Sequence, residues 1–225
     1  MSSSHFNAEA ARHYAKGPPR QVPGFAGLHR MMNLLLAETI PGDASILVLG
    51  AGGGLEIKAM ADFRPGWRFS GVDPSADMLN LAREITADHA PRIALTEGYI
   101  EAAPTGPFDA ATSLLTFHFI PRDQRLETLR QIRRRLKPGA PFILAHVSFP
   151  QTEPERSAWI ARHVAYGQPD DVDPAVAAKA REAIGTRLTI LSPEEEEAML
   201  AEAGFTGITP FYAAFTFRGW LAYAE

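Results

Sequence analysis

The sequence predicts an α/β fold: a doubly wound, mostly parallel sheet of seven strands, with helices on both faces and an antiparallel pair of strands at its C-terminal edge. Three observations lead to this prediction. Short apolar segments alternate with amphipathic segments five times between residues 45 and 149, the pattern of right-handed crossovers between parallel strands. The connections are short, and two β-rich segments end the sequence. With 225 residues, 46% of them apolar, the chain is long enough for one such domain.

The alternating region supplies five strands, expected at residues 45–50, 67–73, 92–98, 108–115 and 141–149. Between them, apolar residues recur at helical spacing and predict helices over 54–63, from Ser75 onward and over 123–136. Ser75 is a favourable N-cap residue, because its hydroxyl can accept a hydrogen bond from the first helical turn. These elements form the parallel part of the sheet.

Two helical regions lie outside this alternation. At the N-terminus we expect a short helix over 5–16, ended by Pro18 and Pro19, and a second helix over 25–39. Residues 151–191 are charged and punctuated by proline, with no strand among them. We interpret this segment as a helical cap inserted over the ligand edge of the sheet, within a single domain spanning residues 1–225.

The C-terminal region is expected to return to the sheet. Ser192 and Glu195 form the pattern of a capping box, which predicts a helix over 193–203 and accounts for the four consecutive glutamates as favourable charge at a helix N-terminus. The segments 205–215 and 217–225 are β-rich and are expected to pair antiparallel.

Composition narrows the functional classes. The sequence has no cysteine, so disulfides, thiolate metal sites and a cysteine nucleophile are excluded. Its net charge of −4 gives no basic field for nucleic acid or an anionic membrane, and no apolar run approaches the ~20 residues of a membrane span. The seven histidines show no metal-binding spacing. We expect a cytoplasmic protein with a small-molecule partner, no membrane partner and no metal. Nucleic acid is disfavoured but left open, as is the oligomeric state, a homodimer included.

A glycine-rich turn follows the first strand in the stretch ILVLGAGGGLE, residues 46–56. A dinucleotide-binding turn needs a third glycine where Leu55 stands, and a phosphate-binding P-loop needs Gly-Lys-Ser/Thr, which is absent. The remaining pattern, Gly50, Gly52 and Gly54, would let the backbone close on a zwitterionic amino-acid tail, with nearby amides taking its carboxylate. The alternative is a turn that only tightens the packing of strand on helix.

An acidic residue ends the second strand. Asp73 follows Gly54 by 19 residues and lies at the carboxyl end of the neighbouring strand, where a carboxylate can accept both hydroxyls of a ribose. As an alternative, it only forms the turn before Pro74. Together, the glycine turn and Asp73 favour a nucleoside ligand.

These residues resemble the class I S-adenosylmethionine-dependent methyltransferases, over about residues 44–149. GVDPSADMLNLAR matches the family's second motif, and "EGYIEAAP" and "FDAATSLLTFHFI" resemble its third- and fourth-strand motifs. Val48 and Tyr99 stand where relatives usually have acidic residues. The resemblance implies a Rossmann-like sheet, S-adenosyl-L-methionine as cofactor and S-adenosyl-L-homocysteine as product. The cofactor contacts that it implies are Gly50, Ala51, Gly52, Gly54, Asp73, Pro74, Met78, Tyr99, Ile100 and Ser113.

The layout is most similar to a bacterial branch related to enzymes that act on carboxymethoxyuridine-type tRNA positions. In that branch an N-terminal segment covers the cofactor, which matches Tyr14, Arg20 and Pro23 and implies that residues 1–40 cover the cofactor edge. Tyr14 is therefore interpreted as a lid residue with a catalytic role, or as a residue that packs its own helix on the sheet.

In-line methyl transfer needs alignment, a dry site and in some cases a base. His118, just past the fourth strand, is the candidate base, with a packing role as the alternative. His146 is expected to face a helix layer. His163 and Tyr166 are candidates for facing substrate from the cap, with an exposed helix face as the alternative. Trp159 and Phe149 add apolar surface there.

The predicted function is methyl transfer from S-adenosylmethionine to a small, partly apolar acceptor under the 151–191 cap. One alternative is a tRNA-modifying methyltransferase of the same fold, which a basic surface beside the cofactor edge would favour. A second is a non-catalytic or cofactor-remodelling protein that binds S-adenosylmethionine, an alternative suggested by Val48 and Tyr99. A nicotinamide-dependent reductase is opposed by Leu55.

Overall fold

The structure is a computed structural model that describes residues 17–169 and 171–225. Its centre is one seven-stranded sheet in the order β3-β2-β1-β4-β5-β7-β6. The strands are β1 (Ser45–Leu49), β2 (Arg68–Asp73), β3 (Ile93–Glu97), β4 (Ala110–Leu114), β5 (Pro141–Val147), β6 (Phe205–Ala214) and β7 (Phe217–Ala224). β1 to β5 pair parallel, whereas β7 pairs antiparallel with both β5 and β6. The predicted fold class is confirmed.

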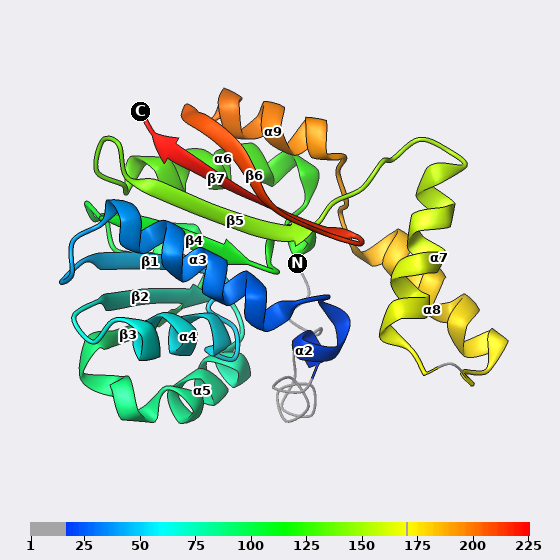
Figure 1. Cartoon of the computed structure of the whole chain (residues 1–225), viewed down its shortest axis with the longest axis horizontal. Coiled ribbons are helices and arrows are strands. Elements are labelled where there is room, and N and C mark those ends of the chain that lie inside the picture. The colour runs from blue at the N-terminus through cyan, green and yellow to red at the C-terminus, as the bar shows by residue number, and fades with distance from the viewer. Residues whose placement is uncertain (1–16, 170) are drawn as a thin grey trace.

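Helices cover both faces of the sheet (Figure 1). In the described part of the chain, the longer helices are α3 (Phe25–Thr39), α4 (Leu55–Phe63), α5 (Ala76–Ile85), α6 (Arg122–Arg134), α7 (Glu155–Gly167), α8 (Pro174–Arg187) and α9 (Pro193–Glu202). Short 3-10 turns are η2 (Ala87–Arg92), η3 (Ile100–Ala102) and η4 (Phe117–Phe119).

Two separate cores follow from the alternation of side chains along the strands. In β1, Ile46 and Val48 pack with α3, α4 and α5 on one face, whereas Leu47 and Leu49 pack with α6 and α9 on the other. All four of these side chains are nearly or fully buried. A strand that is apolar at every position is the expected signature of a parallel sheet covered on both faces.

Two predicted helix caps are present in the structure. The Ser75 hydroxyl accepts a hydrogen bond from the Met78 amide at 3.3 Å, at the start of α5. At the start of α9, Ser192 and Glu195 exchange both hydrogen bonds of a capping box. The glutamate run therefore begins a helix, as its position predicts.

The N-terminal prediction needs one correction. Pro18 and Pro19, expected to end a helix, lie within one among the described residues, α2 (Gly17–Gln21). The helix expected over residues 5–16 lies outside the described residues.

The cap segment leaves the sheet after β5 and returns before α9. Its two helices, α7 and α8, extend beyond the carboxyl end of β5, at the right of the view, with α2 on the same side (Figure 1). These elements and the strand ends enclose the site described next. In the described part of the chain, no helix has both the length and the apolar character needed to cross a membrane.

Candidate functional site

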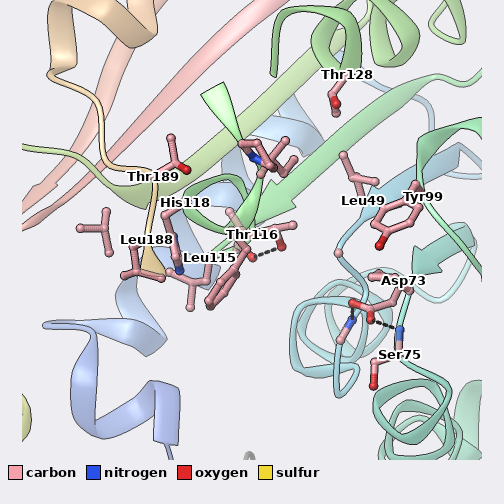
Figure 2. Close-up of a pocket in the computed structure, with 18 of the residues that line it drawn as sticks. Leu49, Asp73, Ser75, Tyr99, Leu115, Thr116, His118, Thr128, Leu188 and Thr189 are labelled. Carbon is pink, nitrogen blue, oxygen red and sulfur yellow. Dashed lines mark hydrogen bonds between the residues drawn. The ribbon is translucent and has the colours of Figure 1, made fainter. Parts of the chain in front are cut away.

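A cavity of about 1070 Å³ lies at the carboxyl ends of β1, β2 and β4. Figure 2 shows two opposed walls. The glycine wall consists of Gly50, Gly52, Asp73, Tyr99 and Ile100, and the histidine wall of His118, Phe119, His163, Leu188 and Thr189. Crevices at the carboxyl ends of parallel strands are the usual ligand sites of such sheets.

The three glycines of the turn serve different purposes. Gly50 and Gly52 line the cavity, and Gly50 has a φ of 77°. A Cβ on Gly50 would lie 1.9 Å from Thr116 Oγ1, so a side chain there would displace the segment that follows β4. Gly54, with φ of 82°, does not line this cavity, and its Cβ would lie 2.9 Å from the Cα of Ala82 in α5. Gly54 thus serves the packing of strand on helix, whereas Gly50 and Gly52 line the cavity, where contact with a ligand stays a prediction.

The amides of this turn are largely used within the protein. Gly50 and Ala51 donate to the Val72 carbonyl at 2.8 and 3.0 Å, and Gly54 donates to the Ala51 carbonyl at 2.9 Å. Gly52 donates to Asp73 Oδ2 at 2.9 Å. The expectation that amides of the turn receive a ligand carboxylate is therefore wrong for these four amides.

Asp73 is fixed in orientation by two backbone amides. Besides the Gly52 amide, the Ser75 amide donates to Asp73 Oδ1 at 2.9 Å, as Figure 2 shows. Burial raises the pKa of Asp73, and this effect outweighs the two amide hydrogen bonds, which lower it. Each carboxylate oxygen can accept a second hydrogen bond, so the side chain can receive two hydroxyls from the cavity.

Beside Asp73, the ends of β2 and β3 form a mostly apolar surface. Pro74, Met78, Tyr99 and Ile100, all predicted contacts, line the cavity. Met78 and Ile100 are nearly fully buried, whereas Tyr99 is 50% exposed. This surface is suited to the face of an aromatic base.

Two other predicted contacts lie elsewhere. Ser113 is fully buried, and its hydroxyl donates to the Leu49 carbonyl at 2.9 Å, so it holds β4 to β1 and does not line the cavity. Ala51 lines only a small adjoining pocket. Tyr14 lies outside the described residues. Pro23 accepts a hydrogen bond from the Tyr212 hydroxyl, which joins the N-terminal region to β6.

His118 lies in η4, on the wall opposite Asp73. It is 6% exposed, and its Nδ1 has no hydrogen-bond partner among the described residues. Burial lowers the pKa of His118 well below its usual value, with smaller contributions from His146, Arg125 and His163. The imidazole is therefore neutral at pH 7 and has a lone pair available to accept a proton.

Behind His118 lies a buried polar cluster. The His146 ring is 6.1 Å from that of His118, and its Nε2 lies 3.4 Å from Glu196 Oε1 in α9. Glu196 also pairs with Arg125 of α6, and all three side chains of the cluster are almost fully buried. His146 thus faces the helix layer, as predicted.

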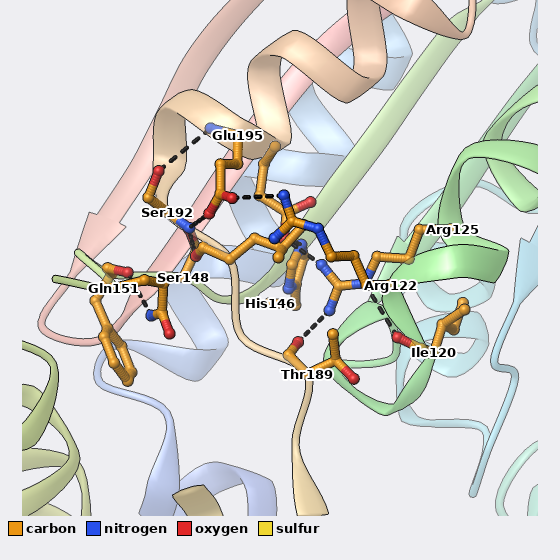
Figure 3. Close-up of polar contacts among 12 residues, drawn as sticks. Ile120, Arg122, Arg125, His146, Ser148, Gln151, Thr189, Ser192 and Glu195 are labelled. Carbon is orange, nitrogen blue, oxygen red and sulfur yellow. Dashed lines mark hydrogen bonds and ion pairs between the residues drawn. The ribbon is translucent and has the colours of Figure 1, made fainter.

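Residues 188–191, where the cap segment leads into α9, complete the histidine wall (Figure 3). Thr189 donates its amide to the His118 carbonyl at 2.9 Å and accepts a hydrogen bond from Arg125. The Ser148 hydroxyl donates to the Leu191 carbonyl at 2.9 Å. These contacts place Leu188 and Thr189 in the cavity wall.

The cap's aromatic residues take a different position from the one predicted. Trp159 stacks on Phe149 with ring centroids 6.5 Å apart, and both Trp159 and Tyr166 contact Phe215 in the turn between β6 and β7. None of these aromatic residues lines the cavity. Of the cap residues singled out, only His163 does, and its Nδ1 lies 2.7 Å from Thr216 Oγ1. The aromatic residues fasten the cap to the sheet.

Several cavity residues had no signal in the sequence. Thr116, Asp123, Glu127, Arg187 and Thr189 are polar residues in the segment after β4, in α6 and in the cap. Only Thr116 lies within a recognised motif, where it was not singled out, and the packing of the cap over the strand ends brings these residues together. Among residues 17–169 and 171–225, no group of three or more His, Asp or Glu side chains is arranged to hold a metal ion.

Comparisons with known proteins agree with this geometry. A methyltransferase domain family matches residues 46–139. The carboxy-S-adenosyl-L-methionine synthase of Pseudomonas fluorescens strain Pf0-1 is 27% identical over 226 residues, covering 96% of this chain and 91% of that protein. The Pseudomonas putida GB-1 protein of the same name is 26% identical with the same coverage.

Solved structures show the same fold. A putative O-methyltransferase from Nostoc punctiforme superposes with a TM-score of 0.68 at 20% identity, over 96% of this chain and 59% of that one. The chain thus spans about three fifths of that structure. The chain thus matches a methyltransferase domain family over residues 46–139 and has the fold of a putative O-methyltransferase.

Proposed function

We propose that the protein transfers a methyl group from S-adenosylmethionine to a small, partly apolar acceptor bound against the histidine wall. The observation that carries this proposal is Asp73, a carboxylate fixed by the amides of Gly52 and Ser75 at the mouth of a large cavity. Its open acceptor positions suit the two hydroxyls of a ribose.

The chain's residues fit this cofactor. Pro74, Met78 and Ile100 offer an apolar surface for the base next to Asp73, and the lack of a side chain on Gly50 lets Thr116, another residue of the cavity wall, lie against the turn. When bound, S-adenosylmethionine supplies an electrophilic methyl group. The residues of the chain hold the two ligands in line and exclude water.

The size and charge of the cavity support a small acceptor. Its volume of about 1070 Å³ lies just above the usual range for small-molecule sites, roughly 300–1,000 Å³, as a cavity that holds a cofactor and a small acceptor requires. Its described lining contains four carboxylates, Asp73, Glu101, Asp123 and Glu127, and one cation, Arg187. Because negative charge predominates, the cavity favours a neutral or cationic acceptor over the phosphate backbone of a tRNA.

On this proposal His118 is the catalytic base. Its neutral imidazole accepts the proton that a hydroxyl or amine loses as it is methylated. The carbonyl of His118 is held by the Thr189 amide, so the cap fixes the base as well as covering it.

The test begins with the ligand. Isothermal titration should show binding of S-adenosylhomocysteine, and a screen of small acceptors with S-adenosylmethionine should give a methylated product by mass spectrometry. For an acceptor that turns over, His118→Gln should lower kcat by about 10²–10⁴-fold and leave the affinity for S-adenosylhomocysteine unchanged. Absence of any affinity for S-adenosylmethionine and S-adenosylhomocysteine would refute the proposal.

A second candidate is remodelling of the cofactor itself: a carboxylate donor passes its carboxyl group to the methyl carbon, and the proton that this carbon loses takes the place of the carboxyl group on the donor. It is favoured by the relatives named carboxy-S-adenosyl-L-methionine synthase, whose similarity extends over 96% of this chain. Arg187, at the end of α8, would meet the anionic donor. Mass spectrometry separates the two: a carboxylated S-adenosylmethionine supports this candidate, and a methylated acceptor with S-adenosylhomocysteine supports the first.

A further inference from the structure

Behind the glycine turn lies a second, much smaller pocket of about 10 Å³, enough for roughly one water molecule. It shares Gly50, Leu114 and Leu115 with the large cavity, so the two adjoin at the turn. Its polar side chains are Glu56, from the first turn of α4, and His29, from α3. None of the proposed steps uses this pocket.

Glu56 is a buried carboxyl group with one oxygen unused. The side chain is 6% exposed, and its Oε2 accepts a hydrogen bond from the Leu114 amide at 3.2 Å. Its Oε1 has no partner among the described residues. Burial raises the pKa of Glu56 to about 7, and the contacts with Thr112 and Leu114 only partly oppose this effect. A buried carboxyl group in this state binds either a proton or a cation.

The surroundings favour a cation at this end of the large cavity. The amides of Gly50, Ala51, Gly52 and Gly54 already donate within the protein, so they offer nothing to an anionic group. The strand position that carries an acid in relatives is held here by Val48, which is fully buried and apolar. Two carboxyl groups therefore lie at the turn: Asp73, which accepts the Gly52 amide, and Glu56, in the small pocket beside Gly50.

We propose that Glu56 recognises the ammonium group at the amino-acid end of the ligand, through a water molecule in the small pocket beside Gly50. This inference rests on the proposed function, because it assumes an S-adenosyl ligand in the large cavity. It orients that ligand: the ammonium group lies over the turn beside Leu114, and the ligand carboxylate points away from it.

The pH dependence that follows is that of Glu56 alone. The facing group from α3 is His29, whose pKa burial lowers to about 4, so it stays neutral from pH 6 to 8. β4 contributes the Thr112 hydroxyl and the Leu114 amide, and β1 the apolar Val48. An ammonium group next to Glu56 favours the carboxylate, so binding releases a proton and strengthens as pH rises from 6 to 8.

The experiment compares two ligands that differ in the amino-acid end. S-adenosylhomocysteine carries the ammonium group, whereas 5′-methylthioadenosine shares the adenosine and thioether but lacks it. Glu56→Gln keeps an acceptor for the Leu114 amide but loses the charge. We expect this variant to lower the affinity for S-adenosylhomocysteine about tenfold or more at pH 8. The affinity for methylthioadenosine should change less than twofold. Asp62→Asn, on the exposed end of the same helix, is the matched control and should leave the affinity for both ligands unchanged.

A second measurement uses the unmodified protein and does not depend on the variant folding. Titration calorimetry in two buffers of different ionisation enthalpy should show proton release on binding S-adenosylhomocysteine at pH 7, and none on binding methylthioadenosine. If Glu56→Gln weakens both ligands equally, or if no proton is released, the inference is wrong while the proposed function stands. If neither ligand binds the unmodified protein, the proposed function itself fails.

Discussion

The two walls of the cavity are built in different ways. The residues of the glycine wall lie between Gly50 and Ile100 in the sequence, and hydrogen bonds between neighbouring strand ends fix it, chiefly those that Gly52 and Ser75 donate to Asp73. The histidine wall gathers residues from 118 to 189, and a buried ion pair between Arg125 and Glu196 lies behind it. One wall is thus set by local backbone geometry and the other by long-range packing. We expect substitutions to separate binding of the adenosyl ligand from the integrity of the acceptor side.

The largest effect is expected at the buried ion pair. Arg125→Met leaves Glu196 without its cation and the carbonyls of Ile120 and Thr189 without their donor. Breaking a buried pair costs about 3–5 kcal/mol, so the free energy of unfolding in urea should fall by that amount. Arg130→Met is the control, since Arg130 lies 3.5 Å from Glu202 at the surface. Equal losses in the two variants would show that the pair does not stabilise the fold.

Glu56 is expected to cost the ligand-free protein stability. Its pKa is about 7 in the folded chain and 4.5 in the unfolded chain, so the folded state binds more protons between these values and loses stability as pH rises through 7. The full difference between the two pKa values corresponds to a loss of about 3 kcal/mol in the free energy of unfolding. Glu56→Gln should therefore be more stable than the unmodified protein at pH 8 and show little gain at pH 4.5. Urea unfolding at both pH values measures this, and an equal gain at both would contradict the assignment.

On the glycine wall, Asp73→Asn should lower the affinity for S-adenosylhomocysteine about 10–100-fold, because it removes the charge from the hydrogen bonds to the ribose hydroxyls. The fold should survive, since the amide oxygen still accepts one of the two backbone donors. Glu84→Gln, exposed on α5, is the control. Unchanged affinity in titration calorimetry would remove Asp73 from the site.

The smallest effect is expected at the base of the cap. Ser148→Ala removes the hydrogen bond to the Leu191 carbonyl and should lower the free energy of unfolding by about 1 kcal/mol. Protease cleavage within residues 151–191 should become faster, with affinity for S-adenosylhomocysteine within twofold of the original. Thr209→Ala, which loses an exposed local bond to Gly207, is the comparison. If ligand affinity fell instead, the two walls would not be independent.

Most of the fold could be predicted from the sequence. The strands, the order of helices and the caps at Ser75 and Ser192 follow from local patterns, and the structure confirms them. Pro18 and Pro19 were expected to stop a helix but lie within α2, because the tendency of proline to break helices does not hold at every helical position.

The site was predicted unevenly, for a physical reason. Gly50, Gly52 and Asp73 belong to turns whose conformation is fixed by residues nearby in sequence. Tyr166 was a candidate for the cavity, with an exposed helix face as the alternative, and Trp159 was expected to add apolar surface there. Both pack on Phe215, and Tyr166 is largely exposed, because an apolar pattern alone does not specify the neighbour of an aromatic side chain. Glu56 was missed because its burial depends on β4 lying against α4.

The hydrogen bond from Ser148 to Leu191 joins the point where the chain leaves the sheet after β5 to the segment just before α9. Everything between these two residues can therefore be lengthened, shortened or exchanged without moving the strands that carry Gly50 and Asp73. Such an architecture allows one half of the molecule to keep its chemistry while the other half diversifies. Grafting this segment between homologues would be a direct way to change which molecules the catalyst accepts.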